Sequence, residues 1–569
     1  MMMKTLLVAI NSQFVHTNLA VLYLKAACSG IGNTEILEFT VNEPINRIYS
    51  RIISENPDVV CFSCYIWNIE VVSKLSDDLK KAMPGIIIIA GGPEVSFENG
   101  GLLAENRNVD YIIAGEGEEK LPWLLNLIKD GRTPGPEEIQ WLKSYSEIKN
   151  LENLRLPYTM IEKGSLKNRI AYIEASRGCP FRCAYCISSV TKGVRYFPLE
   201  KVYEAIEILS ESGSEIIKFV DRTFNCNEER ALNIWQYILK FRDKGMVFHF
   251  EIDPGLLTDD MLKCLEKMPE GLVQVEAGIQ SVHRNTLSAV QRPDNTEKAF
   301  DALKRLIFFG NIHVHVDLIA GLPYESYGNF RISFNRVYSL FAHRFQLGFL
   351  KLLRGSELKN RAERFGICYR SYPPYEIIGN SYISPAELVR LKDIEECLEL
   401  FYNSGRFMLT MKILYYALGE PFAFYEKLSS YMRQKGYLDR SVGAGELYWI
   451  LYDYVKQEYP FIANDIAESL RYDYLSSMKR PTLPEFLQKN DYSLRKEKEK
   501  LISQHQNRLK DMLPRLKFKS LNEIWHQIYI SEFKFENKSE FLPNGLMVFD
   551  FGDISPVTGL AKSYPLGME

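Results

Sequence analysis

The sequence has no apolar run long enough to cross a membrane and no excess of charge of one sign. Its 569 residues contain 69 Lys and Arg against 72 Asp and Glu, a formal net charge of −3. A spanning helix needs about 20 apolar residues, and the stretch Thr5 to Ile10 is shorter even than the core of a secretory signal. No global field draws the chain to a membrane or to nucleic acid. We therefore expect a cytoplasmic, globular protein whose partners include neither.

Cysteine is sparse and unevenly spaced. Ten cysteines in 569 residues form no disulfide framework and are typical of a reducing compartment. Three of them stand together at CxxxCxxC spacing, Cys179, Cys183 and Cys186, and no further cysteine follows until Cys226. Three thiolates can hold three corners of a 4Fe-4S cube and leave one iron open. A zinc knuckle would need a fourth Cys or His at short spacing, and none is present.

The chain is too long for one hydrophobic core, and its sequence character divides it into three blocks. In the first block, residues 1–140, short apolar runs alternate with amphipathic stretches. The runs are Leu6 to Ile10, Ile36 to Val41, Val59 to Ser63, Ile86 to Ala90 and Tyr111 to Ala114. Strand-helix alternation predicts an α/β domain, a doubly wound parallel sheet with helices on both faces.

Unusual residues in this block follow directly after the predicted strands. Ligands of such sheets bind beyond the carboxyl ends of the strands. The turns are Asn11 to Gln13, Ser63 to Asn68, Gly91-Gly92-Pro93-Glu94 and Gly115-Glu116-Gly117-Glu118. Gly91 and Gly92 would let a flat or phosphorylated ligand approach the backbone closely. Generic doubly wound domains also end strands in glycine and serine, so no single turn identifies a site.

The second block, residues 165–360, contains six strand-like runs, each followed by a helical stretch or a turn. They are Ile170 to Ala175, Ile216 to Asp221, Val247 to Ile252, Leu272 to Glu276, Ile312 to Ile319 and Phe345 to Leu350. Six such units predict a partial parallel barrel with the cysteine loop after its first strand. Chemistry in barrels takes place at the carboxyl ends of strands, so polar residues there are candidate ligand contacts.

These features together resemble the cobalamin-dependent radical SAM enzymes, where SAM is S-adenosylmethionine. The cysteine spacing, with aromatic Tyr185 before the last thiol, resembles the radical SAM motif. The resemblance implies that Cys179, Cys183 and Cys186 hold a 4Fe-4S cluster whose open iron takes the amino and carboxylate groups of SAM. Reduction then cleaves SAM to a 5′-deoxyadenosyl radical. The strand-end turns of the first block resemble a cobalamin-binding domain, and an electron donor such as flavodoxin or ferredoxin is implied.

The resemblance also implies which residues contact the cofactors. The cobalamin groove is assigned Ser63, Gly91, Gly92 and Glu94; the SAM contacts are assigned Tyr185, Asp221, Thr223, Glu251, Gly278, Ile279 and Leu322. A carboxylate such as Glu251 can accept from both ribose hydroxyls, and Asp221 or Thr223 could receive the ammonium. Gly278 would admit an adenine edge. A buried acid at a strand end is as often part of a structural hydrogen-bond or ion-pair network as it is a ligand contact.

The first block departs from other cobalamin proteins in one respect. It lacks the Asp-x-His-x-x-Gly motif that supplies a histidine to cobalt, and His16 is its only histidine. We therefore expect cobalamin to bind base-off, without a histidine ligand from that motif. Trp67, Tyr65 and water are candidates for the lower face of the corrin.

The third block, residues 370–569, is expected to be a mainly helical domain with a loop-like tail from Phe549 to Glu569. It resembles an uncharacterised C-terminal extension of one subgroup of the family. The favoured reaction is methylation of an unactivated carbon by way of methylcobalamin. The alternative within the same architecture is a cobalamin-dependent radical cyclase or ring-contracting enzyme. The substrate is expected to be a small molecule, of a class that the sequence does not identify.

Two interpretations from other classes stay open. A methylthiotransferase acting on tRNA would need three N-terminal cysteines for a second cluster, and Cys28, Cys61 and Cys64 are three. Cys61 and Cys64 lie within and just past one predicted strand, so they should point to different sides of it. A cobalamin-sensing protein without turnover is the other alternative, although it would not need an open iron site.

Overall fold

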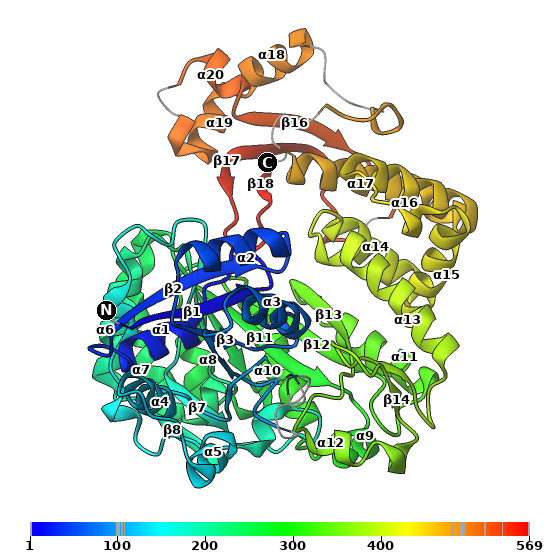
Figure 1. The fold of residues 1–569 in the computed structure, drawn as a ribbon. Helices are drawn as coiled ribbons and strands as arrows, with labels where there is room; N and C mark the ends of the chain where they lie inside the picture. Colours follow the sequence, from blue (N-terminus) through cyan, green and yellow to red (C-terminus); the bar gives the residue numbers. More distant parts are fainter. Residues whose placement is uncertain are drawn as a thin grey trace. The chain divides into compact units, whose positions relative to one another are not determined.

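The computed structural model describes residues 3–97, 103, 106, 108–478, 482–488, 495–516, 519–537 and 539–566. Figure 1 shows the course of the chain, coloured from blue at the N-terminus to red at the C-terminus. The chain divides into two compact units. The first unit comprises Met1–Phe309, Ile319–Ser326 and Gly348–Ser384; the second comprises Gly310–Leu318, Tyr327–Leu347 and Pro385–Glu569. No described helix is both long enough and apolar enough for a bilayer crossing.

The first unit begins with a five-stranded parallel sheet of order β2-β1-β3-β4-β5. The strands are β1 (Lys4–Asn11), β2 (Asn33–Thr40), β3 (Val59–Ser63), β4 (Ile87–Gly91) and β5 (Tyr111–Ile113). β1 pairs with both β2 and β3, so the strand order reverses at this point. In sheets of this kind the crevice for a ligand lies at such a switch point, beyond the carboxyl ends of the strands.

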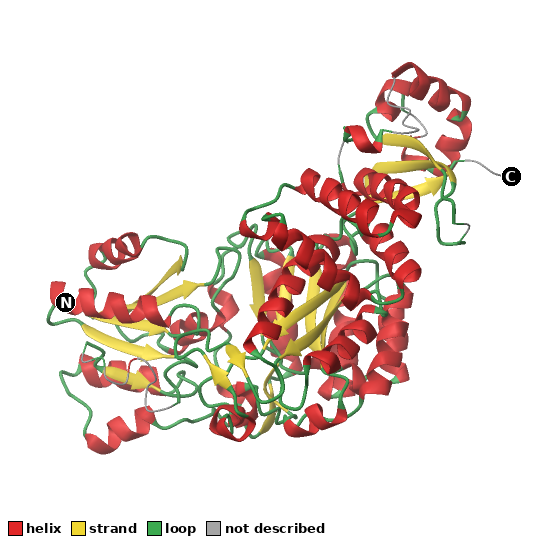
Figure 2. Cartoon of the chain, turned by 90° about the vertical axis from the view of Figure 1, so that its right-hand side faces the viewer, coloured by secondary structure: helices red, strands yellow, loops and turns green. Residues whose placement is uncertain are grey.

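Helices cover both faces of this sheet, as Figure 2 shows. They are α1 (Leu19–Ala27), α2 (Ile45–Ser54), α3 (Ile69–Ala82), α4 (Lys120–Lys129) and α5 (Pro136–Lys143). Alternate residues of β1 enter opposite cores. Leu6 and Val8 pack with α2 and α3, and Leu7 packs with α1, α4 and α5. Because both faces are covered, the inner strands β1, β3 and β4 are largely apolar instead of alternating, whereas the edge strand β2 is mixed. The predicted doubly wound fold is confirmed.

The second sheet has six strands in the order β13-β12-β11-β10-β9-β6. They are β6 (Ile170–Ile173), β9 (Ile216–Phe219), β10 (Val247–Ile252), β11 (Val273–Gln280), β12 (His313–Ala320) and β13 (Arg344–Phe349). The pairs β6–β9, β9–β10 and β10–β11 are parallel. Each strand of this sheet lies beside the next one along the chain, as in a wound barrel, and β6 and β13 are the two edge strands. This is the predicted six-strand core.

The helices of the second sheet follow its strands. They are α6 (Leu199–Glu211) before β9, α7 (Glu228–Ile238), α8 (Asp259–Glu266), α9 (Arg284–Ala289), α10 (Thr296–Phe309) and α11 (Tyr327–Tyr338). Asn227 caps α7 and Thr258 caps α8, since each side chain accepts a hydrogen bond from a first-turn backbone N–H.

A short antiparallel hairpin follows the first strand of this sheet. β7 (Ser176–Cys179) pairs with β8 (Gly193–Tyr196), and residues 180–192 form the loop between them. Two of the three motif cysteines lie in that loop, and the third ends β7. The sequence predicted only a loop here, because four-residue strands of mixed polarity carry no periodic pattern.

The third block begins with helices and ends in a sheet. The main helices are α13 (Pro385–Leu398), α14 (Met408–Leu418), α15 (Pro421–Gln434), α16 (Ala444–Glu458) and α17 (Ala463–Ser477). Shorter helices follow: α18 (Arg495–Gln504), α19 (Gln506–Met512) and α20 (Leu521–Trp525). The mainly helical character is as predicted.

The loop-like tail, however, was a wrong prediction. β16 (Ile528–Phe533), β17 (Gly545–Ile554) and β18 (Ala561–Pro565) form an antiparallel sheet. Its buried residues Ile530 and Val548 pack with Leu509 and Ile524 of the short helices. The glycines and prolines of the tail lie largely in the turn between β17 and β18 and at the chain end, so their density hid two strands.

Candidate functional site

The cysteine loop is held by backbone geometry and by hydrogen bonds to distant residues. Gly178 in β7 has φ +98°, and a Cβ there would lie 2.1 Å from the carbonyl oxygen of Gly193 on β8. Only glycine fits this close pairing. Ala184, in the middle of the loop, receives a hydrogen bond on its carbonyl from Leu358 N (2.7 Å) and donates one to Val290 O (2.8 Å). The loop between the cysteines is therefore fixed from two sides.

Each of the three motif sulfurs has a polar neighbour. The backbone N–H of Ser188 donates to Cys186 Sγ (3.4 Å), and Arg292 Nη1 donates to Cys183 Sγ (3.8 Å). Cys179 Sγ lies 3.4 Å from the hydroxyl oxygen of Thr223. Burial raises the pKa of the Cys183 thiol, and the nearby Arg292 charge opposes that rise. Three thiols on one loop, surrounded by donors to sulfur, fit a cluster held by thiolates.

Asp221 and Thr223 lie beside this loop. Asp221 is buried and accepts hydrogen bonds from Ala175 N (2.9 Å) and the Ser176 hydroxyl (2.5 Å). Burial raises the pKa of Asp221 to about 7. The carboxyl of Asp221 therefore anchors the start of the hairpin, while Thr223 contacts the thiol of Cys179.

The other SAM candidates lie along β10, β11 and the turn after β12. Glu251 lies 3.7 Å from Lys218 Nζ, and burial raises its pKa. Gly278 is crowded, because a Cβ there would lie 2.1 Å from the side-chain amide nitrogen, Nε2, of Gln280. Gly278 and Ile279 line one small cleft, and Leu322 is fully buried. Tyr185 is partly buried near Cys183, and this burial raises its pKa.

Arg292 is a site residue that the sequence did not reveal. Its guanidinium contacts Cys183 Sγ, Gly278 O (2.5 Å) and a carboxylate oxygen of Asp253 (3.4 Å). It thus joins the cysteine loop to the end of β11. Nothing in the local stretch Gln291-Arg292-Pro293 marks it, because its partners are far away in the sequence.

A cavity of about 710 Å³ opens between the first sheet and the cysteine hairpin. From the first sheet it is lined by strand-end turns: Asn11, Ser12, Ser63, Tyr65, Trp67, Gly91, Gly92, Gly115, Glu116, Gly117 and Glu118. From the other side it is lined by Glu174, Ser176, Arg177, Gly178, Ile187, Ser188, Val190, Thr191 and Arg222. The turns singled out in the sequence therefore share one cavity with the residues around the cysteine motif.

Of the four residues assigned to the cobalamin groove, three line the cavity and one does not. Ser63, Gly91 and Gly92 are in its wall. Glu94 is buried away from it, where it accepts a hydrogen bond from the Tyr375 hydroxyl (2.8 Å) and lies 3.6 Å from Arg354. The structure thus places Glu94 in a tie to a late loop of the chain, which its place in a glycine-rich turn did not indicate.

Tyr65 and Trp67 present a flat surface in the cavity wall. Their rings stack with centroids 4.5 Å apart and planes 4° apart. Trp67 Nε1 donates to Ile10 O (3.0 Å), which fixes the orientation of the indole. His16 also lines the cavity, and its Nδ1 lies 2.6 Å from the Tyr172 hydroxyl. A rigid aromatic surface beside backbone that carries no side chains suits a large planar ligand.

The N-terminal cysteines do not form a second cluster site. Cys28 and Cys61 pack in the core on one face of the first sheet, and Cys64 packs in the core on the other face. This confirms that Cys61 and Cys64 point to different sides. Burial raises the pKa of all three thiols, which disfavours the thiolate form that binds iron.

Three family models match successive parts of the chain. The B12 binding domain matches residues 5–125 and the Radical SAM superfamily matches residues 173–337. A family described as a protein of unknown function, DUF4080, matches residues 363–546. The first match covers the first sheet, and the second covers the cysteine hairpin and strands β9 to β12.

Curated relatives match about half of the chain. The 2-(S-pantetheinyl)-carbapenam-3-carboxylate methyltransferase of Streptantibioticus cattleyicolor is 28% identical over 301 residues, which cover 48% of this chain and 44% of that protein. The cobalamin-dependent radical SAM methyltransferase TokK of Streptomyces tokunonensis is 25% identical, over 51% of this chain and 45% of TokK. This chain therefore spans less than half the length of these two relatives.

A solved structure shows the same fold. The cobalamin-dependent S-adenosylmethionine radical enzyme OxsB, with aqua-cobalamin and S-adenosylmethionine bound, superposes with a TM-score of 0.59 at 14% identity. The superposition covers 83% of this chain and 79% of OxsB. At this identity the likeness extends to the fold alone, which agrees with the two sheets and their order.

Proposed function

Because the chain belongs to the radical SAM proteins that carry an N-terminal cobalamin-binding domain, we propose that it is a methyltransferase acting on an unactivated carbon of a small molecule. Its proposed cofactors are a 4Fe-4S cluster, SAM and cobalamin, with reduced flavodoxin or ferredoxin as electron donor. When bound, the cluster and SAM supply a 5′-deoxyadenosyl radical, and cobalamin supplies a transferable methyl group.

The observation that carries this proposal is the shared cavity. One wall consists of the strand-end turns of the B12 binding domain, and the other carries Gly178, Ser188 and Thr191 of the cysteine hairpin. A ligand in this cavity therefore lies against both the corrin-side turns and the loop that holds the cluster. A substrate placed between the two cofactors could lose hydrogen on one side and gain a methyl group from the other.

The residues of the chain have distinct tasks in this scheme. Cys179, Cys183 and Cys186 hold the cluster, and Arg292 neutralises charge at one of its sulfurs. Gly92 has φ +109° and a hypothetical Cβ 2.6 Å from Cys64 O, so its bare backbone faces the cavity. The stacked Tyr65 and Trp67 rings support a flat ligand from one side.

The test is anaerobic reconstitution with iron, sulfide and hydroxocobalamin, followed by reduction in the presence of SAM and candidate substrates. We expect mass spectrometry to detect both 5′-deoxyadenosine and S-adenosylhomocysteine. Formation of 5′-deoxyadenosine alone, with substrate consumed, would replace the proposal by the cyclase or ring-contraction alternative. Cobalamin binding without any cleavage of SAM, in a protein that holds its cluster, would favour a cobalamin-sensing role.

A further inference from the structure

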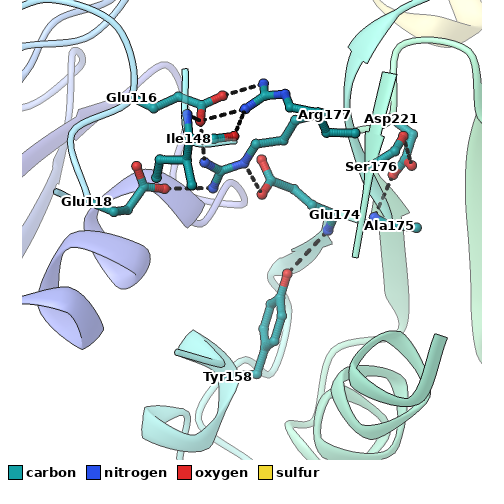
Figure 3. A network of polar contacts seen from close by, with 10 residues as sticks. Glu116, Glu118, Ile148, Tyr158, Glu174, Ala175, Ser176, Arg177 and Asp221 are labelled. Carbon is teal, nitrogen blue, oxygen red and sulfur yellow. Dashed lines mark hydrogen bonds and ion pairs between the residues drawn. The ribbon is translucent and has the colours of Figure 1, made fainter. Parts of the chain in front are cut away.

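An ion-pair cluster joins the cysteine hairpin to the B12 binding domain (Figure 3). Arg177 of β7 lies at its centre. Its guanidinium is 2.7 Å from Glu118, 3.4 Å from Glu116 and 3.0 Å from Glu174. Glu116 and Glu118 belong to the turn after β5, the last strand of the first sheet, whereas Glu174 follows β6 of the second sheet.

The charged side chains of the cluster are largely buried. Arg177 exposes 11% of its side chain and Glu118 exposes 7%. The Tyr23 ring of α1 lies 4.9 Å from the Arg177 guanidinium carbon, and the Phe197 ring lies 5.8 Å from it. Arg195 of β8 pairs with both oxygens of Glu116. Because little water screens these charges, the distances and hydrogen bonds between the arginines and the carboxylates determine how well their charges compensate one another.

Two of the carboxylates, Glu116 and Glu174, respond to this environment in opposite directions. Burial acts to raise the pKa of Glu116, but hydrogen bonds from Arg195 and the charge of Arg177 outweigh it and lower that pKa. For Glu174 burial dominates and raises the pKa despite Arg177. Two guanidinium groups therefore favour the ionised form of Glu116, whereas burial favours the protonated form of Glu174.

Arg177 lies in the strand, β7, that ends at the cysteine motif. It is two residues before the cluster ligand Cys179, and residues i and i+2 lie on the same face of a strand. On the opposite face of β7, the Ser176 hydroxyl donates to Asp221 near the end of β9. The strand that ends in Cys179 is thus attached on one face to the second sheet and on the other to the turn that lines the cavity.

We propose that Arg177 is a positioning residue, whose ion pairs with Glu116 and Glu118 set the separation between the cluster loop and the cobalamin cavity. This inference rests on the proposed function, because a defined separation matters only if both cofactors take part in one reaction. Lysine cannot replace Arg177, since a single ammonium lacks the planar fork that contacts several carboxylates at once.

The test compares Arg177→Lys and Glu118→Gln with the wild type, each loaded with iron, sulfide and hydroxocobalamin. The first readout is the enhancement of cob(II)alamin spin relaxation by the reduced cluster, measured by electron paramagnetic resonance, which depends on their separation and needs no substrate. We expect both variants to keep their iron and to stay folded at the assay temperature while this enhancement changes. We also expect S-adenosylhomocysteine release to fall about tenfold or more, with 5′-deoxyadenosine formation largely kept.

Arg169→Lys is the matched control. Arg169 pairs with Glu38 of β2 at 2.7 Å and is similarly buried, but it does not touch the cysteine hairpin. We expect this control to behave as the wild type. If it caused the same losses, docking of the two sheets in general, and not Arg177, would be responsible, which would overturn the proposal.

Further outcomes separate the two proposals. Wild-type relaxation enhancement and product ratio in both Arg177→Lys and Glu118→Gln would overturn the positioning role. If Arg177→Lys fails to fold, Glu118→Gln decides alone, since it keeps the arginine and the shape of the turn. If the wild type releases no S-adenosylhomocysteine with any substrate, the proposed function fails, but the relaxation measurement still tests the positioning of the loop.

Discussion

The two walls of the cavity are built in different ways. One wall consists of turns that continue directly from parallel strands, such as Ser63 at the end of β3 and Gly91 at the end of β4. The other wall is the β7–β8 hairpin, which belongs to neither parallel sheet. Residues from other parts of the chain hold it in place: Asp221 accepts a hydrogen bond from Ser176, and Glu116 and Glu118 form ion pairs with Arg177.

This difference teaches where each cofactor site is vulnerable. A strand-end turn is carried to its place by its own strand, so it tolerates the loss of single contacts and is sensitive mainly to its backbone conformation. The hairpin depends on polar contacts that converge from other parts of the chain, so single side chains matter more. Changes in the two walls should therefore have separable effects on cobalamin and on the cluster.

The largest expected effect is on the hairpin wall. Cys183→Ser removes one of the three proposed cluster ligands, so we expect iron content and 5′-deoxyadenosine formation to fall to background. Cobalamin binding should stay within about twofold of the wild type, because the strand-end turns are untouched. Iron content is measured by an iron assay, and cobalamin binding is measured by titration. Cys226→Ser, which removes a half-buried thiol outside the motif, should keep the cluster; loss of iron there would contradict the assignment.

Gly92→Ala attacks the other wall. The backbone at Gly92 has φ +109° and a new Cβ would meet Cys64 O at 2.6 Å, so the turn must shift. We expect cobalamin affinity to fall about tenfold, a cost of roughly 1–3 kcal/mol for such strain, with iron content unchanged. Gly131→Ala is the matched control, because Gly131 has φ +69° with nothing within 4 Å of a new Cβ. Equal losses in both variants would contradict a role of the cavity wall.

Arg292→Gln sharpens the comparison within the hairpin. The change removes the charged donor to Cys183 Sγ and the contact with Gly278 O. Loss of positive charge at a cluster sulfur should make reduction harder, so we expect a smaller reduced fraction with dithionite and severalfold slower 5′-deoxyadenosine formation. The control Arg305→Gln breaks an exposed pair with Asp259 and should leave both quantities unchanged. An unaltered reduced fraction in Arg292→Gln would argue against this role.

The smallest expected effect concerns pH. Burial raises the pKa of Asp221 from 3.8 to about 7, so between these values the folded state binds a proton that the unfolded state has released. The stability contributed by Asp221 is therefore present in acid and is lost as pH rises from about 4 to about 7. Asp221→Asn should flatten the wild-type decline in melting temperature over this range.

The control for this effect lies in the second unit. Asp473 is buried, accepts from Leu409 N and Thr410 N, and has a pKa that burial raises to about 7. Asp473→Asn should remove the part of the pH dependence of the melting temperature that comes from Asp473. The effects of the Asp221 and Asp473 changes should add, because no hydrogen bond joins the two residues. A melting curve of Asp221→Asn that declines as steeply as the wild type would show that Asp221 does not titrate in this way.

Much of the site could be predicted from local pattern. The apolar run Ile86 to Ala90 followed by Gly91-Gly92 predicted both a strand and its ligand-side turn, because strand and turn are adjacent in sequence. The spacing of Cys179, Cys183 and Cys186 likewise predicted three thiols close together at one loop, because they are near one another in the sequence. β17 and β18 were missed because the turn residues between them dominated the pattern.

What local pattern could not predict was pairing across the chain. Glu94 appeared as a cavity residue and instead accepts from the Tyr375 hydroxyl, 281 residues later. Arg292 gave no signal, although it contacts the thiol of Cys183, 109 residues earlier. In both cases the partner depends on how loops from different strands meet, which no short segment encodes.

The amino-acid sequence by itself determined the two sheets, the turns that follow their strands and the three thiols of one loop, because each depends on residues that are near one another in the chain. Only the tertiary structure decided that these turns and this loop enclose one cavity, and that Arg177, Glu116 and Glu118 join its two walls. The physical reason is that buried charges must find partners within a few ångströms, and only folding brings such partners together across 59 residues or more.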